Sequence, residues 1–160
     1  CNTFAKKIRM EFTALLDQVQ QIGANAATTK TEKLQAICDL LKENISYYDW
    51  VGFYFRNGDK EELILGPYAG AETDHTVIPF GKGICGQVAV SNQNFVVPDV
   101  SAQDNYIACS MTVKSEIVVP LFVNGANIGQ IDIDSETLDA FGVADERFLE
   151  QVNVEVAKLY

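Results

Sequence analysis

Apolar residues recur at helical spacing at both ends of the chain. Residues 3–23 and 31–45 place hydrophobic side chains every three or four positions, and residues 144–159 repeat the pattern at the other end. The polar loop "GANAATTK" separates the first two segments, and Thr29 and Thr31 are the candidate N-caps of the second. The pattern predicts three amphipathic helices that pack on the rest of the domain.

Between these helices, the chain is rich in strand-forming residues and is broken by turn signals. "RNGDK" and "NGAN" each lie between two strand-like segments and indicate hairpins. A short helix is expected at 83–92, and strands are expected at 49–55, 61–66, 75–80, 94–99, 115–123 and 127–134. The order of helices, sheet and helix predicts an α+β domain with an antiparallel sheet and helices packed on it.

The last two strands raise the question of which side chains face one another. A two-residue loop would mix apolar and polar side chains on both faces of this hairpin. A three-residue loop, Val123–Gly125 with its glycine in the left-handed conformation, places Glu116 opposite Asp132 and apolar residues opposite apolar residues. Because a slip of one residue turns every side chain to the other face, the hydrophobic pattern favours the three-residue loop. We therefore predict that Glu116, Asp132 and Asp134 lie on one face.

Two interpretations of this acidic face stay open on the pattern alone. Acidic residues on a half-buried sheet are commonly exposed to solvent, which favours an ordinary polar face. If the carboxylates are instead enclosed, they repel one another, so at least one pKa rises and that group can supply a proton near neutral pH. Such a pocket would also hold an ammonium group.

Aromatic residues alternate with a glycine in the first predicted strand. Trp50, Gly52 and Tyr54 share one face, and Gly52 leaves room between the two aromatic walls. The arrangement fits ordinary core packing, and it also fits an aromatic box for a small organic ligand.

The four cysteines differ in their surroundings. Cys38 lies on the apolar stripe of a predicted helix, which indicates a packing role. Cys85 lies at a predicted helix start, where backbone N–H groups and Lys82 would stabilise its thiolate. Cys109 lies in a connection longer than most, which makes it a candidate nucleophile, although packing is the commoner role for either cysteine alone. With no C-x-x-C pair and a single histidine, the sequence predicts no metal site and no cofactor.

Composition narrows the class of function. The chain has 160 residues, 48% of them hydrophobic and 21% charged, as expected of one globular domain. Its net charge of −10 disfavours binding to nucleic acid or to an anionic membrane surface. The longest apolar stretch, near 117–123, is too short to span a bilayer, and no secretory signal is evident. A cytoplasmic location is therefore expected, where cysteines stay reduced unless they perform redox chemistry.

Five motifs resemble one particular family. "DWVGFY", "LGPYAG", "IPFGKGICG", "IACSMTVKSEIVVPL" and "IGQIDIDS" are together similar to the GAF-domain free methionine-(R)-sulfoxide reductases. The resemblance covers nearly the whole chain, so residues 1–160 are expected to form a single GAF domain. It implies a central antiparallel sheet of about six strands with helices on both faces, and it implies a homodimer.

The resemblance also implies roles for individual residues. Cys109 matches the catalytic cysteine and Cys85 the resolving cysteine of the family. The expected catalytic set is Cys109, Cys85, Glu116 and Asp134, and the expected substrate-binding set is Trp50, Tyr54, Glu116, Asp132 and Asp134. The chain departs from the pattern at His75, where many members carry a third cysteine, so a relay through that position is absent.

The expected activity is reduction of free L-methionine-(R)-sulfoxide through a cysteine sulfenic acid and a disulfide, as part of protection against oxidative stress. Thioredoxin or a similar dithiol would restore the thiols. Two alternatives stay open: a GAF sensor that binds a small molecule without turnover, and a thiol redox switch built on Cys85 and Cys109.

Overall fold

The computed structural model describes the backbone of residues 2–105 and 111–160, with side chains from residue 10 onward. It is an α+β domain in which a six-stranded antiparallel sheet has the order β3-β2-β1-β6-β5-β4. The elements are α1 (Asn2–Ala24), α2 (Lys30–Asn44), β1 (Trp50–Arg56), β2 (Glu62–Ala69), β3 (Val77–Pro79), α3 (Gly83–Ser91), β4 (Phe95–Val97), the 3-10 turn η1 (Val100–Ala102), β5 (Ser115–Val123), β6 (Ala126–Ser135) and α4 (Val143–Ala157). The predicted fold class is confirmed.

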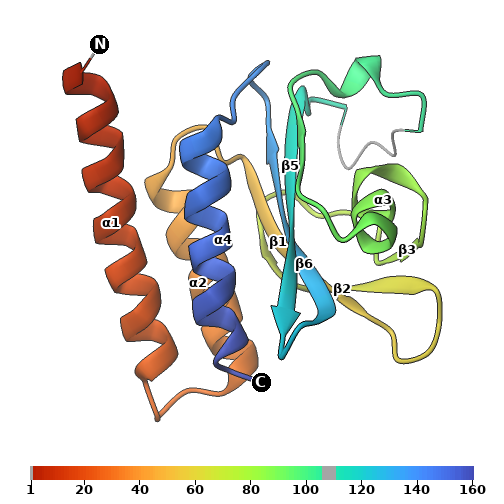
Figure 1. The fold of residues 1–160 in the computed structure, drawn as a ribbon, viewed down its shortest axis with the longest axis horizontal. Coiled ribbons are helices and arrows are strands. Elements are labelled where there is room, and N and C mark those ends of the chain that lie inside the picture. Colours follow the sequence, from red (N-terminus) through yellow and green to blue (C-terminus); the bar gives the residue numbers. More distant parts are fainter. Residues whose placement is uncertain (1, 106–110) are drawn as a thin grey trace.

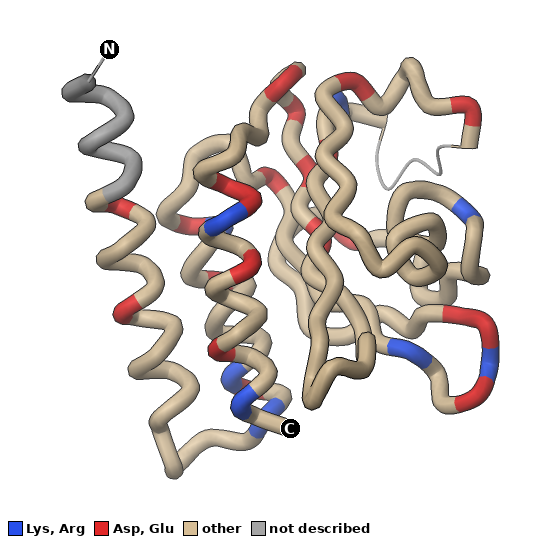
Figure 2. Tube along the Cα trace, in the orientation of Figure 1, with Lys and Arg blue, Asp and Glu red and all other residues tan. Residues whose placement is uncertain are grey.

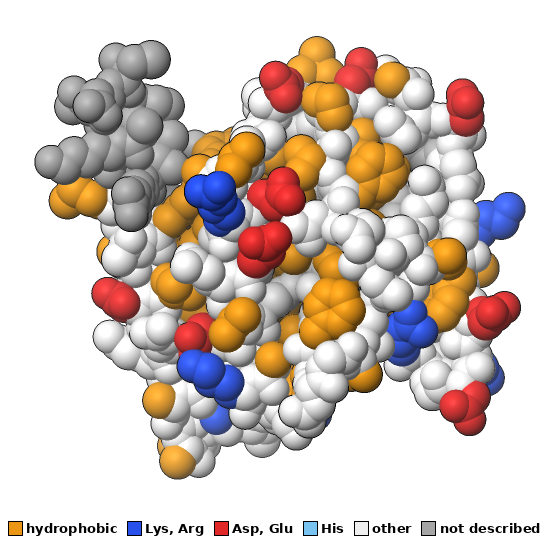
Figure 3. All heavy atoms as spheres, in the orientation of Figure 1, with side chains coloured by type: hydrophobic (Ala, Val, Ile, Leu, Met, Phe, Trp, Pro, Cys, Tyr) orange, Lys and Arg blue, Asp and Glu red, His pale blue; other side chains and the backbone are white. Residues whose placement is uncertain are grey.

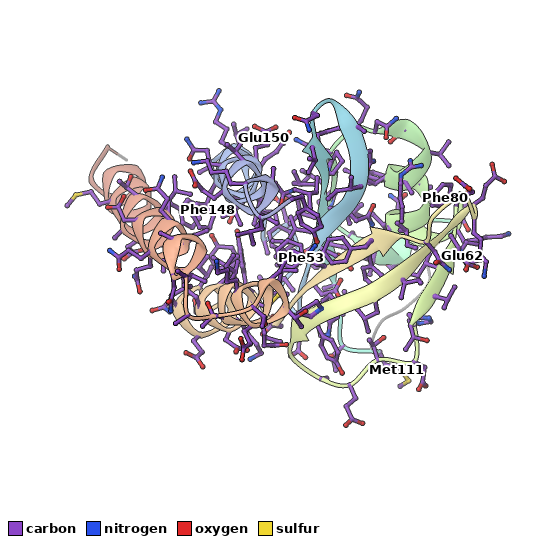
Figure 4. All side chains as sticks on the ribbon, turned by 90° about the horizontal axis from the view of Figure 1, so that it is seen from below. Phe53, Glu62, Phe80, Met111, Phe148 and Glu150 are labelled. Carbon is purple, nitrogen blue, oxygen red and sulfur yellow. The ribbon has the colours of Figure 1, made fainter. Side chains whose placement is uncertain are left out.

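Helices cover both faces of the sheet (Figure 1). The helices α2 and α4 pack on one face of the sheet, where Val51 and Phe53 join a core that includes Phe148. The helix α1 packs on α2 and α4, and Figure 4 shows Phe148 on the side of α4 that faces α1. On the other face, Trp50 and Tyr54 belong to a second core that is covered by α3. Each fully buried side chain of this size stabilises the fold by about 1.5–3 kcal/mol.

The termini of the predicted helices are close to those observed. Thr29, one of the two candidate caps, caps α2: its hydroxyl accepts from the Glu32 backbone N–H, and the Glu32 carboxylate accepts from the Thr29 backbone N–H. Cys38 is fully buried in the helical core, which confirms its packing role. Among the described helices, none combines the length and the hydrophobicity that a bilayer-spanning segment requires.

The hairpin between β5 and β6 corrects one prediction. Val123 pairs with Ala126, so the loop has two residues, and Asn124 (φ 50°) and Gly125 (φ 79°) are both left-handed, as an Asn-Gly hairpin turn requires. The three-residue loop was therefore wrong.

A bulge next to this turn restores the alternation of the strands. Between Leu121 and Phe122 the register shifts, because β6 contributes the extra residue Ile128. Beyond the bulge, Glu116 lies opposite Asp134 rather than opposite Asp132, which was the predicted partner. The apolar residues still face apolar residues, and the predicted common face of the three acidic residues is confirmed.

Gly129, beside this bulge, tests the contact between β6 and β1. It pairs with Phe55, and a Cβ added to it would collide with the backbone oxygen of Tyr54. We expect Gly129→Ala to lower the free energy of unfolding by about 1–3 kcal/mol through overpacking. Urea denaturation followed by the fluorescence of Trp50, the single tryptophan, measures the change.

Gly23→Ala is the matched control for this change. A Cβ at Gly23 meets nothing within 4 Å, and the residue lies in α1. This substitution is expected to raise the free energy of unfolding by about 0.4–1 kcal/mol, because it restricts the unfolded chain. Equal stability of the two variants would contradict the close approach of β6 to β1.

Candidate active site

Three carboxyl groups lie inside the protein on the face of the sheet that α3 covers. Glu116, Asp132 and Asp134 are 3%, 0% and 1% exposed. Figure 2 shows acidic positions within the strands as well as on the helices, and in Figure 3 the charged side chains of the visible face are scattered rather than gathered in one patch. The interpretation of a solvent-exposed polar face is wrong, and the carboxyl groups form an enclosed cluster.

Register brings this cluster together from two strands and places aromatic residues beside it. Asp134 lies opposite Glu116 on one side and opposite Trp50 on the other. Asp132 lies opposite Gly52, in the next row of the same face. Since paired residues of neighbouring strands point to the same side of a sheet, the carboxyl groups and the aromatic rings share one space.

Burial and mutual repulsion set the protonation of the cluster. Desolvation by burial, reinforced by the charges of Asp132 and Asp134, raises the pKa of Glu116 well above its ordinary value. Burial also raises the pKa of Asp132 to about 7, although hydrogen bonds with Cys85 and Glu116 oppose that rise. Glu116 therefore keeps its proton near neutral pH and donates it in a hydrogen bond to the Asp132 carboxylate.

Cys85 contacts this cluster directly. It lies in the first turn of α3, is 4% exposed, and its Sγ donates to Oδ2 of Asp132 at 3.2 Å. The sequence predicts a thiolate stabilised by the helix N-terminus and Lys82. The structure adds an acidic hydrogen-bond partner, Asp132, which sequence reasoning missed and which is placed to accept the thiol proton.

Three aromatic rings stand beside the carboxyl groups. The Trp50 ring stacks on Tyr68 at 5.4 Å between centroids and on Tyr54 at 6.3 Å. The indole N–H of Trp50 donates to the backbone oxygen of Ala71. The Tyr54 hydroxyl donates to the backbone oxygen of His75. Both rings are thus fixed by a polar contact at their edges as well as by stacking.

Two details of this aromatic group differ from the prediction. The space above Gly52 is filled by the indole of Trp50, because a Cβ at Gly52 would collide with that ring, so the glycine makes room for Trp50 and not for a ligand. Tyr68 was missed. It pairs with Gly52 across β1 and β2, and the "RNGDK" hairpin with its register would have been needed to find it.

Two small cavities reach the cluster from different directions. One, of about 10 Å³, is lined by His75, Lys82, Cys85 and Glu116 among others. The other, of about 50 Å³, is lined by Asp49, Trp50, Thr112, Val113, Asp134 and Glu136 among others. The first cavity is lined by the Cys85 end of the cluster. In the second cavity, the carboxyl groups of Asp49 and Glu136 join that of Asp134.

Cys109 lies outside the described residues, as part of 106–110. The described flanks are fixed by hydrogen bonds. The Asn105 side chain donates to the backbone oxygen of Gly81, just before α3, and the Thr112 hydroxyl donates to the Glu136 carboxylate, just after β6. The residues before 106–110 are therefore held near the start of α3, which carries Cys85. The residues after 106–110 are held near the end of β6, which carries Asp132 and Asp134.

Comparisons with known proteins agree on one family. Residues 27–157 match the family model described as "GAF domain". The free methionine-R-sulfoxide reductase of Escherichia coli is 34% identical over 156 residues, which is 98% of this chain and 88% of that protein. The enzyme of the same name from Saccharomyces cerevisiae is 42% identical over 65% of this chain and 58% of that protein. The crystal structure of free methionine-R-sulfoxide reductase from Neisseria meningitidis in complex with its substrate has a TM-score of 0.86 at 37% identity, covering 92% of this chain and 87% of that chain.

The raised pKa of Asp132 predicts a pH dependence of stability. The folded-state pKa of about 7 exceeds the ordinary value of 3.8. At pH values between these two, the folded protein therefore retains a proton on Asp132 that the unfolded chain has released. The free energy of unfolding that proton binding at Asp132 contributes is therefore lost as pH rises through this interval. Asp132→Asn removes the titration, so between pH 4 and pH 8 its free energy of unfolding should rise by about 4 kcal/mol relative to wild type.

Urea denaturation at the two pH values measures this difference. The control is Asp17→Asn, the same chemical change at an exposed position of α1. A constant difference between Asp132→Asn and wild type across the interval would mean that Asp132 is ionised throughout.

Proposed function

Because the chain belongs to the GAF domain family of free methionine-R-sulfoxide reductases, we propose that it reduces free L-methionine-(R)-sulfoxide to methionine with its own cysteines. The observation that carries the proposal is the enclosed contact between the Cys85 thiol and a carboxyl cluster that holds a proton near neutral pH. Residues 1–160 would act as one GAF domain, with the active site on the face that α3 covers.

Glu116 is the proton donor of the proposed reaction. A sulfoxide oxygen leaves sulfur readily only when it is protonated, and Glu116 is the group in which burial and two neighbouring charges hold a proton. Cys109 would attack the sulfur, and the protonated oxygen would move to Cys109 as methionine is released. The products of this step are methionine, reduced by two electrons, and a sulfenic acid at Cys109.

Cys85 completes the cycle. Its Sγ attacks the sulfenic sulfur, the S–O bond breaks, and water and a disulfide are formed. Asp132 is placed to take the thiol proton, since its Oδ2 already accepts the hydrogen bond from that Sγ at 3.2 Å. A dithiol such as thioredoxin then reduces the disulfide by thiol–disulfide exchange. With His75 at the position of the third family cysteine, this dithiol must attack the pair Cys85–Cys109 directly.

The second cavity supports a free amino acid as substrate. Asp134, Asp49 and Glu136 all line it, so three carboxyl groups surround one small cavity. An α-ammonium group fits such a lining, and a methionine residue within a peptide has none. Trp50 and Tyr54 would then contact the methyl and sulfur end. A homodimer, which the family resemblance implies, and a cytoplasmic location complete the proposal.

The first test separates the two cysteines. We expect Cys109→Ser to lower turnover of free methionine-(R)-sulfoxide on the order of a thousandfold or more, because it removes the nucleophile. Cys85→Ser should still release one methionine per protein in a single turnover, but it should cycle poorly with thioredoxin. Methionine is measured by amino-acid analysis.

Cys38→Ser is the matched control, because Cys38 is buried in the helical core on the other face of the sheet and should leave turnover unchanged. Full turnover in Cys109→Ser would show that Cys109 is not the nucleophile. Binding of methionine sulfoxide without any turnover in wild type would identify a sensor instead of an enzyme.

The second test concerns Glu116. Glu116→Gln keeps the shape of the side chain but has no proton to give, so kcat should fall by about 10²–10⁴-fold. In wild type, kcat should also fall as pH rises through the raised pKa of Glu116, and the variant should lack this decline. The control is Glu61→Gln at an exposed loop position. An unchanged kcat in Glu116→Gln would assign the proton to another group.

A further inference from the structure

We propose that the reduced protein binds one thiophilic divalent cation, such as Zn²⁺, through the side chains of Cys85, Glu116 and Asp132. One donor atom from each of these residues lies within 4.8 Å of the other two, and all three residues are buried. The prediction of no metal site rested on the absence of a C-x-x-C pair and on the single histidine. The three ligands proposed here come from α3, β5 and β6, which no local motif links.

The spacing of the donor atoms suits a tetrahedral cation. Zinc binds thiolate sulfur at about 2.3 Å and carboxylate oxygen at about 2.0–2.2 Å, which puts two ligand atoms roughly 3.5 Å apart. The Cys85 Sγ and Asp132 Oδ2 atoms are already 3.2 Å apart. A cation would therefore replace a proton between existing neighbours, with only small side-chain movements.

Buried polar atoms without a hydrogen-bond partner on the same face of the sheet are a second, independent sign of a bound group. The Oδ1 atom of Asp132 is fully enclosed and has no hydrogen-bond partner among the described residues. The same holds for both polar atoms of Gln130, which lies two residues earlier on the same face of β6. Each such buried orphan costs about 1–3 kcal/mol, so this part of the core calls for a ligand. A cation that both oxygens of Asp132 ligate, together with a bound water that donates to Oε1 of Gln130, would satisfy two of these three atoms.

A cation can reach these ligands. The cavity of about 10 Å³ is lined by Cys85 and Glu116 and also by His75, whose imidazole is a common ligand of the same metals. Lys82 is the one lysine in that lining, and it is exposed. The net charge of −10 favours the approach of cations.

The thiolate selects the class of cation. Sulfur ligands favour Zn²⁺, Co²⁺ and Cd²⁺, whereas Mg²⁺ and Ca²⁺ prefer sites made wholly of oxygen. We therefore expect one Zn²⁺ to bind per reduced chain and Mg²⁺ in large excess not to displace it.

The test titrates the full chain, reduced with a phosphine, with Co²⁺ and then with Zn²⁺. Co²⁺ should produce a sulfur-to-cobalt charge-transfer band that saturates at one equivalent and disappears when Zn²⁺ is added. Cys85→Ser should abolish the band and weaken Zn²⁺ binding in calorimetry by about a hundredfold or more, since even changes outside the ligand shell cost roughly 10–100-fold. Glu116→Gln should weaken it too, without loss of the band.

Two matched variants keep the result specific. Cys38→Ser and Cys109→Ser should both retain the band, and thermal unfolding shows whether each variant is folded. A band that survives Cys85→Ser, a band that is lost in Cys109→Ser, or Zn²⁺ binding that Mg²⁺ displaces would each overturn the site.

One consequence rests on the proposed function. Zn²⁺ on Cys85 would occupy the resolving thiol and the proton-donating carboxyl group, so it should inhibit turnover, and a chelator should restore the rate. The two ideas fail separately. If the protein is inactive but shows the Cys85-dependent band, the proposed reductase activity is wrong and the cation site stands. If the protein is active but shows no band, the cation site is wrong and the proposed activity stands.

Discussion

The burial of three carboxyl groups on one face of the sheet is the constraint on which the rest of the site depends. Like charges in a low-dielectric interior cannot all ionise, so at least one proton stays on the cluster at a pH where exposed carboxyl groups have lost theirs. Glu116 and Asp132 carry this effect most strongly, and Asp134 supplies part of the repulsion. The protein thereby keeps an acid available for chemistry, at a cost in stability that the surrounding packing must offset.

That packing comes from the arrangement of the layers. The core formed by α1, α2 and α4 holds the opposite face of β1, β5 and β6, and so fixes the strands that carry the acidic groups and Trp50. The second core, under α3, is smaller and contains the site itself. The larger core thus lies on one face of the sheet, and the face that carries the candidate site is covered by the short helix α3.

Most of the fold follows from local patterns in the sequence, and the departures have physical causes. Helical periodicity located α1, α2 and α4, and turn signals located both hairpins. The predicted length of the loop between β5 and β6 was wrong. The prediction followed the alternation of apolar and polar side chains and gave too little weight to the strong preference of Asn124-Gly125 for a two-residue turn. The structure satisfies both preferences with a bulge at Ile128, which no local pattern in the sequence predicts.

The site shows the same limit in another form. The alternation of side chains along the strands placed Glu116, Asp132 and Asp134 on one face. It does not tell whether other elements cover that face. Exposed carboxyl groups would be ionised by solvent contact, whereas covered ones retain a proton. The contact of Cys85 with Asp132 depends on how α3 docks, which no spacing in the sequence encodes. This docking also links the two properties proposed for the cluster. A carboxyl group that takes a proton from a neighbouring thiol is, for the same geometric reason, a carboxyl group that can share a cation with it. Chemistry at this site therefore requires that protons, and not thiophilic metals, occupy the space between Cys85 and Asp132.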